Sequence, residues 1–162
     1  MHFGSRENRS YPIEGGKLTV QKTEQARYRR QRPVVRAARA DARALADKWQ
    51  HPELADDLAQ LVTEVITNAV IHGTAGRGSQ VHVTYRLLGD RLRVDVRDAA
   101  TGQPRVMRST SLGGEPREYG RGLILVATLA DRWGMTPRVI GKSVWFELVL
   151  SSRDAATQEA DR

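Results

Sequence analysis

The apolar residues of this chain recur with two different periods, and the change between them constrains the fold more than any other feature. From residue 34 to 72 they recur every three or four positions, as in helices that bury one face. From residue 80 to 98 they alternate, as in strands that bury one face. Because both layers need an apolar partner, the pattern predicts an α+β two-layer sandwich with helices on one face of a sheet.

The helical part divides at His51-Pro52, where proline interrupts the first helix and suits the start of the second. Pro33 suits the first turn of the first helix, and the second is expected to stop at Gly73. The apolar positions that define the two faces are Val34, Ala38, Leu45 and Trp49, then Leu54, Leu58, Leu61, Val62, Val65, Ala69 and Val70.

The alternating part predicts an antiparallel hairpin, with SQVHVTYRLL and RLRVDVRD joined by a turn at Gly89-Asp90. A weaker strand pattern lies within residues 17–30. Further on, GRGLILVATLADRWG predicts a glycine turn and an apolar helix, and RVIGKSVWFELVL predicts a strand, a Gly-Lys turn and a last strand. Hairpin-length connections favour a mixed, mostly antiparallel sheet.

The length of 162 residues is typical of one domain, which we assign to residues 17–150. Residues 1–16 and 151–162 are polar and are predicted to be disordered tails. Residues 99–119 form a connection of small, polar, Gly and Pro residues, and loops of this length are usually functional or disordered.

The chain has no cysteine, which excludes disulfides and thiolate metal sites. No apolar run approaches the ~20 residues that span a bilayer. The first 16 residues lack the apolar core of a signal peptide. These features indicate a protein of a reducing compartment, with the cytoplasm as the expectation and no membrane partner.

The net charge of +7 is confined to the N-terminal part, where residues 1–49 carry 12 Lys and Arg against 5 Asp and Glu. The remaining residues carry 14 of each sign. A basic segment suggests nucleic-acid binding, yet no helix-turn-helix, zinc-ligand or aromatic platform motif accompanies it. We therefore favour solvated arginines over nucleic-acid binding, and an acidic protein partner stays open.

Three polar residues, Glu64, Asn68 and His72, follow one another at a spacing of four within the apolar second helix. They therefore lie on one stripe, which faces either water or a ligand. A carboxylate can accept a proton or orient water, and an asparagine oxygen is a hard ligand suited to Mg²⁺. An arbitrary E-x-x-x-N on a helix is more often a solvated face.

Two further segments carry groups that could bind a ligand. Asp98 ends a strand, where its carboxylate could accept a hydrogen bond from an amino group, and Gly102 nearby would admit a flat ring. Gly120, Arg121, Gly122 and Leu123 open a helix, whose free N–H groups and dipole favour an anion. Taken alone, each is equally a simple turn.

The order of these segments resembles the GHKL ATPase superfamily, and most closely its small stand-alone anti-sigma-factor serine/threonine kinases of bacteria. EVITNAVIHG resembles the N box, DAATG the first glycine box, YGRGLILVATLADRWG the second, and GKSVWFEL the closing strand. The resemblance covers about residues 33–150. The commoner first glycine box has a glycine where this chain has Ala100.

The resemblance implies a role for each candidate residue, with ATP and Mg²⁺ as cofactors. Glu64 would be the general base or a water-orienting carboxylate, and Asn68 the Mg²⁺ ligand. Asp98 would bind the adenine amino group and Gly102 would border the adenine, with Ser143 supporting the pocket. The phosphates would lie against the segment Gly120, Arg121, Gly122 and Leu123, under a lid of residues 103–119. His72 would cap the helix or approach the ribose-phosphate, and a structural histidine is an equal alternative.

The resemblance implies an ATP-dependent serine/threonine protein kinase and anti-sigma factor acting in trans. Its partners would be a sigma factor, an anti-sigma antagonist, or both, and such proteins often form homodimers. The alternative is a nucleotide-binding module that sequesters a partner without chemistry. A histidine kinase is disfavoured, because none of the four histidines lies in a suitable phosphoacceptor helix.

Overall fold

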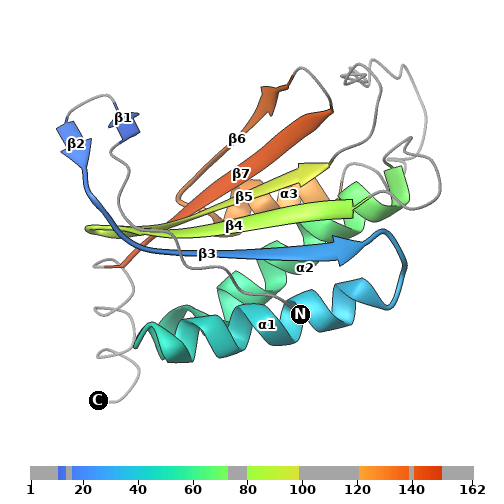
Figure 1. Cartoon of the computed structure of the whole chain (residues 1–162), viewed down its shortest axis with the longest axis horizontal. Coiled ribbons are helices and arrows are strands. Elements are labelled where there is room, and N and C mark those ends of the chain that lie inside the picture. Colours follow the sequence, from blue (N-terminus) through green and yellow to red (C-terminus); the bar gives the residue numbers. More distant parts are fainter. Residues whose placement is uncertain (1–10, 14–15, 73–79, 99–120, 139–140, 151–162) are drawn as a thin grey trace.

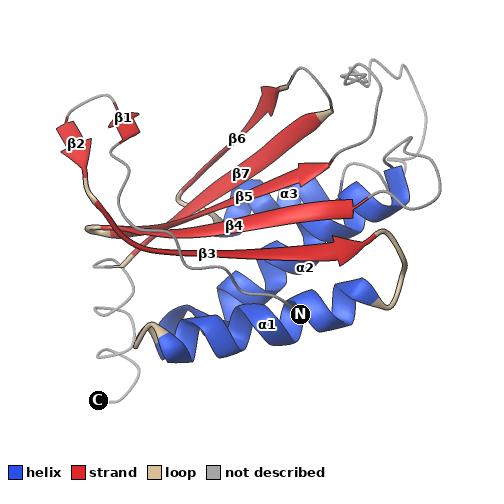
Figure 2. Cartoon of the chain, viewed as in Figure 1, coloured by secondary structure: helices blue, strands red, loops and turns tan. Residues whose placement is uncertain are grey.

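The computed structural model describes residues 11–13, 16–72, 80–98, 121–138 and 141–150. It has two layers, a five-stranded sheet with all helices on one face (Figures 1 and 2). The strand order is β3-β4-β5-β7-β6, and every neighbouring pair is antiparallel. The predicted α+β sandwich is therefore confirmed. The sheet comprises β3 (Val20–Arg29), β4 (Gln80–Leu88), β5 (Arg91–Asp98), β6 (Arg132–Pro137) and β7 (Lys142–Val149).

The helical layer consists of α1 (Val34–Lys48), α2 (Ala55–His72) and α3 (Arg121–Leu129). Pro33 precedes α1 in helical geometry. Pro52 begins a short 3₁₀ turn, η1 (Pro52–Leu54), and α2 follows it directly, so the proline restarts the helix one turn later than expected. Asp56 and Asp57 lie in the first turn of α2, where the helix dipole favours negative charge.

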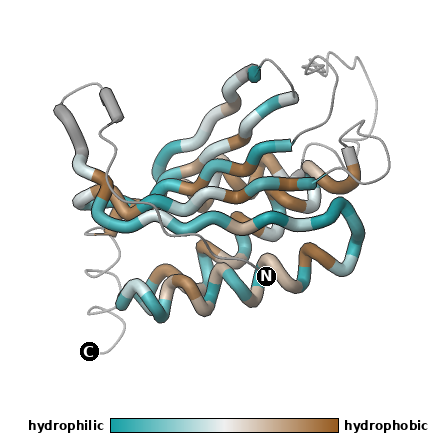
Figure 3. The backbone as a smooth tube through the Cα atoms, in the orientation of Figure 1, coloured by the Kyte–Doolittle hydropathy of each residue, from teal (hydrophilic) through white to brown (hydrophobic). Residues whose placement is uncertain are grey.

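The core lies between the helices and the inward face of the sheet. Figure 3 shows hydrophobic and hydrophilic positions alternating along β4 and β5, as the period of two predicts. The residues predicted to line the helical faces are mostly buried. The buried set includes Ala38, Leu45, Trp49, Leu54, Leu58, Leu61, Val62, Val65 and Ala69 from the helices, and Val81, Val83, Tyr85, Leu92, Val94, Val96, Phe146 and Leu148 from the strands.

Polar contacts tie the edge strand β3 to the helices. The Tyr28 hydroxyl donates to Asp41 on α1 at 2.7 Å. Lys48 at the end of α1 pairs with Glu24, a carboxylate that is buried on β3. Burial raises the pKa of Tyr28 far above its ordinary value, with the neighbouring Tyr85 adding to it, so the phenol stays a donor.

The structure differs from the sequence prediction in two places. The helix predicted to run through residue 134 ends at Leu129, and β6 begins at Arg132 rather than at Arg138. Asp131 makes this change of direction, since its N–H donates to the Glu147 carbonyl (3.0 Å) and its carboxylate accepts the Val149 N–H (2.7 Å). Pairing with β7 therefore overrides the local helical pattern.

The second difference concerns the N-terminal segment, which was predicted to be a tail through residue 16. The short strands β1 (Tyr11–Ile13) and β2 (Gly16–Leu18) pair antiparallel, and they form a sheet of their own. Residues 1–10 and 151–162, the other parts of the predicted tails, lie outside the described residues.

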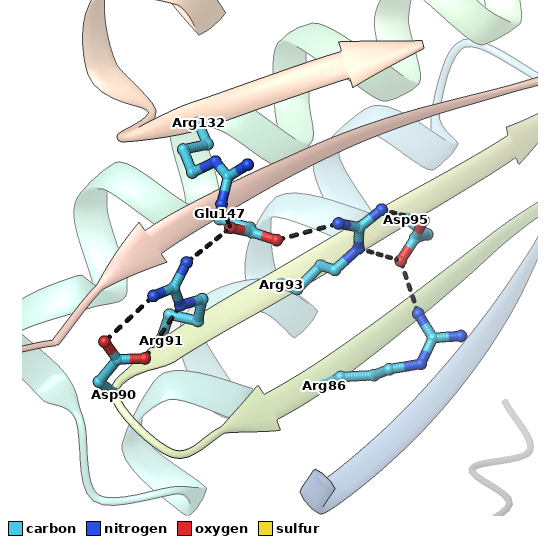
Figure 4. A network of polar contacts seen from close by, with 7 residues as sticks. All are labelled: Arg86, Asp90, Arg91, Arg93, Asp95, Arg132 and Glu147. Carbon is cyan, nitrogen blue, oxygen red and sulfur yellow. Dashed lines mark hydrogen bonds and ion pairs between the residues drawn. The ribbon is translucent and has the colours of Figure 1, made fainter. Parts of the chain in front are cut away.

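A network of ion pairs covers the outer face of the sheet, the face away from the helices (Figure 4). The Glu147 carboxylate is 2% exposed and accepts from Arg93 Nη1 at 2.9 Å and Arg91 Nη1 at 3.3 Å. Arg132 Nη1 lies 4.0 Å from the same carboxylate. These contacts connect β5, β6 and β7, and the buried carboxylate is balanced by three guanidinium groups.

The Trp145 ring lies between Arg93 and Gly134 on this outer face. The Arg93 guanidinium carbon is 4.1 Å from the ring centroid, within cation–π range. A Cβ atom at Gly134 would lie only 2.7 Å from Trp145 Cζ2. Glycine at this position therefore allows the indole to cover the edge strand β6.

We expect Gly134→Ala to lower the free energy of unfolding by about 1–3 kcal/mol, as in overpacked sites generally. Urea unfolding measures the loss. In a Trp145→Phe background, which removes the atoms nearest the new methyl group, the same substitution is expected to cost less than about 1 kcal/mol. An equal loss in both backgrounds would mean that contact with the indole is not the cause.

Candidate functional site

Three of the elements that carry candidate residues meet near the end of α2. The Arg30 Nε, just beyond β3, donates to the Val70 carbonyl in the last turn of α2 at 3.1 Å. Strand pairing aligns Arg29 with Gln80, then Val81 with Asp98, then Asp98 with Lys142. The end of α2, the end of β5 and the start of β7 therefore lie at the same end of the molecule (Figure 1).

Glu64 and Gly122 are neighbours across the boundary between α2 and α3. A Cβ atom built on Gly122 would lie 2.9 Å from Glu64 Oε2. Glu64 is half-buried, and Gly122 is in the first turn of α3. The carboxylate thus lies at a helix N-terminus, where free N–H groups and the dipole favour negative groups. Two sequence segments more than 50 residues apart are brought together here.

Asn68 follows Glu64 by one turn of α2 and is also half-buried. Its carboxamide lies on the same stripe, nearer the end of the helix. His72 is the last residue of α2, and its side chain lies outside what the structure describes. The sequence did not decide whether this stripe faces water or a ligand. In the structure, its first residue, Glu64, lies against α3.

Asp98 is the last residue of β5 and is only 3% exposed. It pairs in register with Val81, a core residue, so its side chain points to the helix-facing side of the sheet. A buried carboxylate in this position needs donors. The hydrogen bond from Asp98 to an exocyclic amino group stays a prediction.

The remaining candidates divide into three groups. Gly102, Gly120 and the lid of residues 103–119 lie outside the described residues, as does the side chain of Arg121 at the start of α3. Leu123 is half-buried in the first turn of α3, beside Gly122. Ser143 is buried but is not brought together with Asp98, because it pairs with Arg97 and lines a pocket on the outer face.

Sequence reasoning missed Arg30, which binds the Val70 carbonyl and so holds the end of α2 against β3. Arg30 and Val70 are 40 positions apart in the sequence. No local pattern around an arginine that follows a strand predicts such a contact. The nearest signal is its position among the basic residues 27–32, which were interpreted only as solvated charge.

The residues present fit a magnesium nucleotide. Mg²⁺ usually takes one or two protein ligands, substrate phosphates and several waters. Asn68 would supply one oxygen, and no group of three or more His, Cys, Asp or Glu side chains forms a metal cluster among the described residues. The Glu64 carboxylate lies beside Gly122, because a Cβ atom there would be 2.9 Å from Glu64 Oε2.

The two-layer fold places Glu64 of α2 beside Gly122 at the N-terminus of α3, and a helix N-terminus of this kind suits phosphate groups. The model of the histidine kinase-like ATPase domain family matches residues 29–147, and the chain belongs to that family. The domain is therefore ATP-binding, and its relatives usually bind ATP with Mg²⁺. A search of curated proteins found no match. Within the described residues, no helix is long and apolar enough to cross a membrane.

Proposed function

We propose that this ATP-binding regulatory protein is an ATP-dependent serine/threonine protein kinase and anti-sigma factor. Its substrate would be a hydroxyl group on a protein antagonist, acted on in trans, in the cytoplasm. The observation that carries this proposal is the contact between Glu64 and Gly122. It brings a proton acceptor to the helix N-terminus where phosphate groups are expected to bind.

Phosphoryl transfer depends mainly on positioning and charge neutralisation. Glu64 would accept the proton of the attacking hydroxyl, and the α3 N-terminus would hold the phosphates through backbone N–H groups. Asn68 would hold Mg²⁺, which supplies charge neutralisation to the phosphates when bound. Asp98 would orient the adenine ring by accepting a hydrogen bond from its amino group.

A target in another protein is supported by the positions of the described histidine side chains. His51 binds Glu53 between α1 and α2, with 2.9 Å between Nδ1 and Oε1. His82 lies on the outer face of the sheet, opposite in register to Arg97. His82 is thus on the opposite face of the sheet from Glu64, and His51 lies before the start of α2, more than two turns of that helix from Glu64, so a phosphoacceptor in trans fits better than self-transfer to these histidines.

Asn68→Ala tests the nucleotide site itself. Mg-ATP at a hundredfold excess over its Kd is expected to stabilise the wild type by about 2.7 kcal/mol, because it binds only the folded state. The variant is expected to lose most of this gain in stability, because Asn68 would no longer hold the Mg²⁺ that neutralises the phosphates. Thermal unfolding with and without Mg-ATP measures both.

The matched control is Gln60→Ala, which changes an exposed amide two turns earlier on the same helix. It should keep the full ligand-induced shift. No shift in the wild type across millimolar Mg-ATP would contradict nucleotide binding. An equal shift in wild type and Asn68→Ala would remove Asn68 from the site.

A further inference from the structure

A pocket of about 240 Å³ opens on the outer face of the sheet, opposite the helices. Its lining includes Arg27, His82, Arg97, Arg138 and Ser143. Strand pairing aligns Arg27 with His82, His82 with Arg97, and Arg97 with Ser143, so these four side chains form one row across β3, β4, β5 and β7. Residues paired in register point to the same face.

The positive charge of this row is not balanced by carboxylates. Arg27, Arg97 and Arg138 form no ion pair with any residue in the described parts of the chain. Among the described lining residues, Asp95 is the one carboxylate. It accepts from Arg86 Nη1 at 2.5 Å and from Arg93 Nε at 3.2 Å.

The rest of the outer face is different, because its arginines are tied to acids. Arg91 and Arg93 both bind Glu147, and Arg91 also binds Asp90 (Figure 4). The two halves of this sheet face therefore differ in charge balance. Arginines toward the Asp90 turn are paired with acids, and those toward the end of β5 are not. Charge is concentrated where the pocket is.

The charge of this row affects the pKa of His82. Partial burial lowers the pKa of His82, and the positive charges of Arg27 and Arg97 lower it further. This shift favours the neutral ring, which can donate one N–H. Ser143, which is 1% exposed, adds a hydroxyl at the pocket wall.

We propose that this pocket binds a phosphate-type oxyanion, either as the free ion or as a monoester on a protein side chain. Guanidinium groups match such an ion through paired N–H donors, and the neutral imidazole and the hydroxyl add further donors. The volume is below the 300–1,000 Å³ typical of pockets for larger ligands, which favours one phosphate group over a whole nucleotide. A second copy of this basic face would be repelled.

The pocket is separate from the nucleotide site. Arg97 and Asp98 are consecutive residues of β5, and strand alternation points them to opposite faces. Arg97 faces the pocket, while Asp98 faces the helices. The proposal does not depend on kinase activity, and the NMR signal of His82 reports on the outer face alone.

The test is a phosphate titration followed through the His82 ring protons by NMR at constant ionic strength, with His82→Gln assigning the signal. The wild type should show saturable binding and a rise in the pKa of His82, because the anion offsets Arg27 and Arg97. Arg97→Ala should weaken binding about tenfold, the effect of losing one charge-assisted hydrogen bond. Arg97→Lys keeps the charge and loses the paired donors. Its affinity for phosphate should therefore lie between those of the wild type and Arg97→Ala.

The matched control is Arg39→Ala, which removes the same charge from an exposed position on α1. It should bind phosphate as the wild type does. Equal weakening in Arg39→Ala and Arg97→Ala, or no change in the His82 signal, would overturn the proposal.

A second arm identifies the source of the phosphate. A phosphoserine peptide of neutral flanking sequence is titrated beside inorganic phosphate, with the unphosphorylated peptide as reference. Tighter binding of the phosphopeptide assigns the pocket to a protein-borne monoester, and equal binding assigns it to the free ion. Binding of the unphosphorylated peptide with equal affinity would overturn the requirement for phosphate.

Discussion

Glu147→Ala is expected to lower the free energy of unfolding by about 3 kcal/mol, the lower end of the range for breaking a buried ion pair. The carboxylate is 2% exposed, whereas Arg91 and Arg93 are 18% and 26% exposed and partly screened by water. Removing it takes away the acid that three guanidinium groups share, although Arg91 keeps Asp90 and Arg93 keeps Asp95. For a domain of this size the melting temperature should fall by roughly 6–12 °C.

Asp90→Ala is the matched control, because Asp90 binds the same Arg91 but its side chain is 53% exposed. It should cost less than about 1 kcal/mol. Glu147→Gln keeps the shape and loses the charge, so it separates packing from electrostatics. If Glu147→Ala and Asp90→Ala unfold at the same urea concentration, the buried carboxylate does not hold the outer face together.

The second large effect concerns phosphoryl transfer and depends on the proposed kinase function. Glu64→Gln should lower the transfer rate by about 10²–10⁴, the usual contribution of a general base, while Mg-ATP binding stays unchanged. The amide is isosteric with the carboxylate, so it still fits beside Gly122. Single-turnover transfer from labelled ATP to a protein acceptor measures the rate, and thermal unfolding with Mg-ATP measures binding.

Gly122→Ala gives an independent check of the same contact. The new methyl group would lie 2.9 Å from Glu64 Oε2, and the flexible carboxylate end can move away. Stability should therefore hold or rise, because alanine favours a helix by up to about 1 kcal/mol over glycine, while transfer falls. Full transfer by Glu64→Gln would exclude Glu64 as the base. Normal binding by a wild type without turnover would favour the partner-sequestering module.

Much of the fold follows from sequence periodicity. The helices at residues 34–48 and 55–72 and the hairpin at residues 80–98 were predicted with nearly correct bounds. Long segments with one clear period specify which face is buried, and that decides their structure. The region around residues 130–140 was predicted wrongly, because LADRWG continues a helical pattern while pairing with β7 turns Arg132–Pro137 into a strand.

The candidate site was predictable in its parts but not in its assembly. Spacing placed Glu64 and Asn68 on one stripe, and the resemblance associated that stripe with Gly122. The contact between Glu64 and Gly122, and the separation of Ser143 from Asp98, come from packing and from strand register. A shift of one residue in register reverses the face of every side chain, and no local pattern around Ser143 determines it.

The sequence by itself determined the two-layer class and the ATP-binding family, because these depend on local periods and short motifs. Only the tertiary structure decided which charges are balanced. Arg93 and Arg97 look alike in the sequence, yet cross-strand pairing places Arg93 opposite Glu147 and Arg97 opposite His82 and Ser143. Their different environments arise because neighbours in a sheet come from distant parts of the chain.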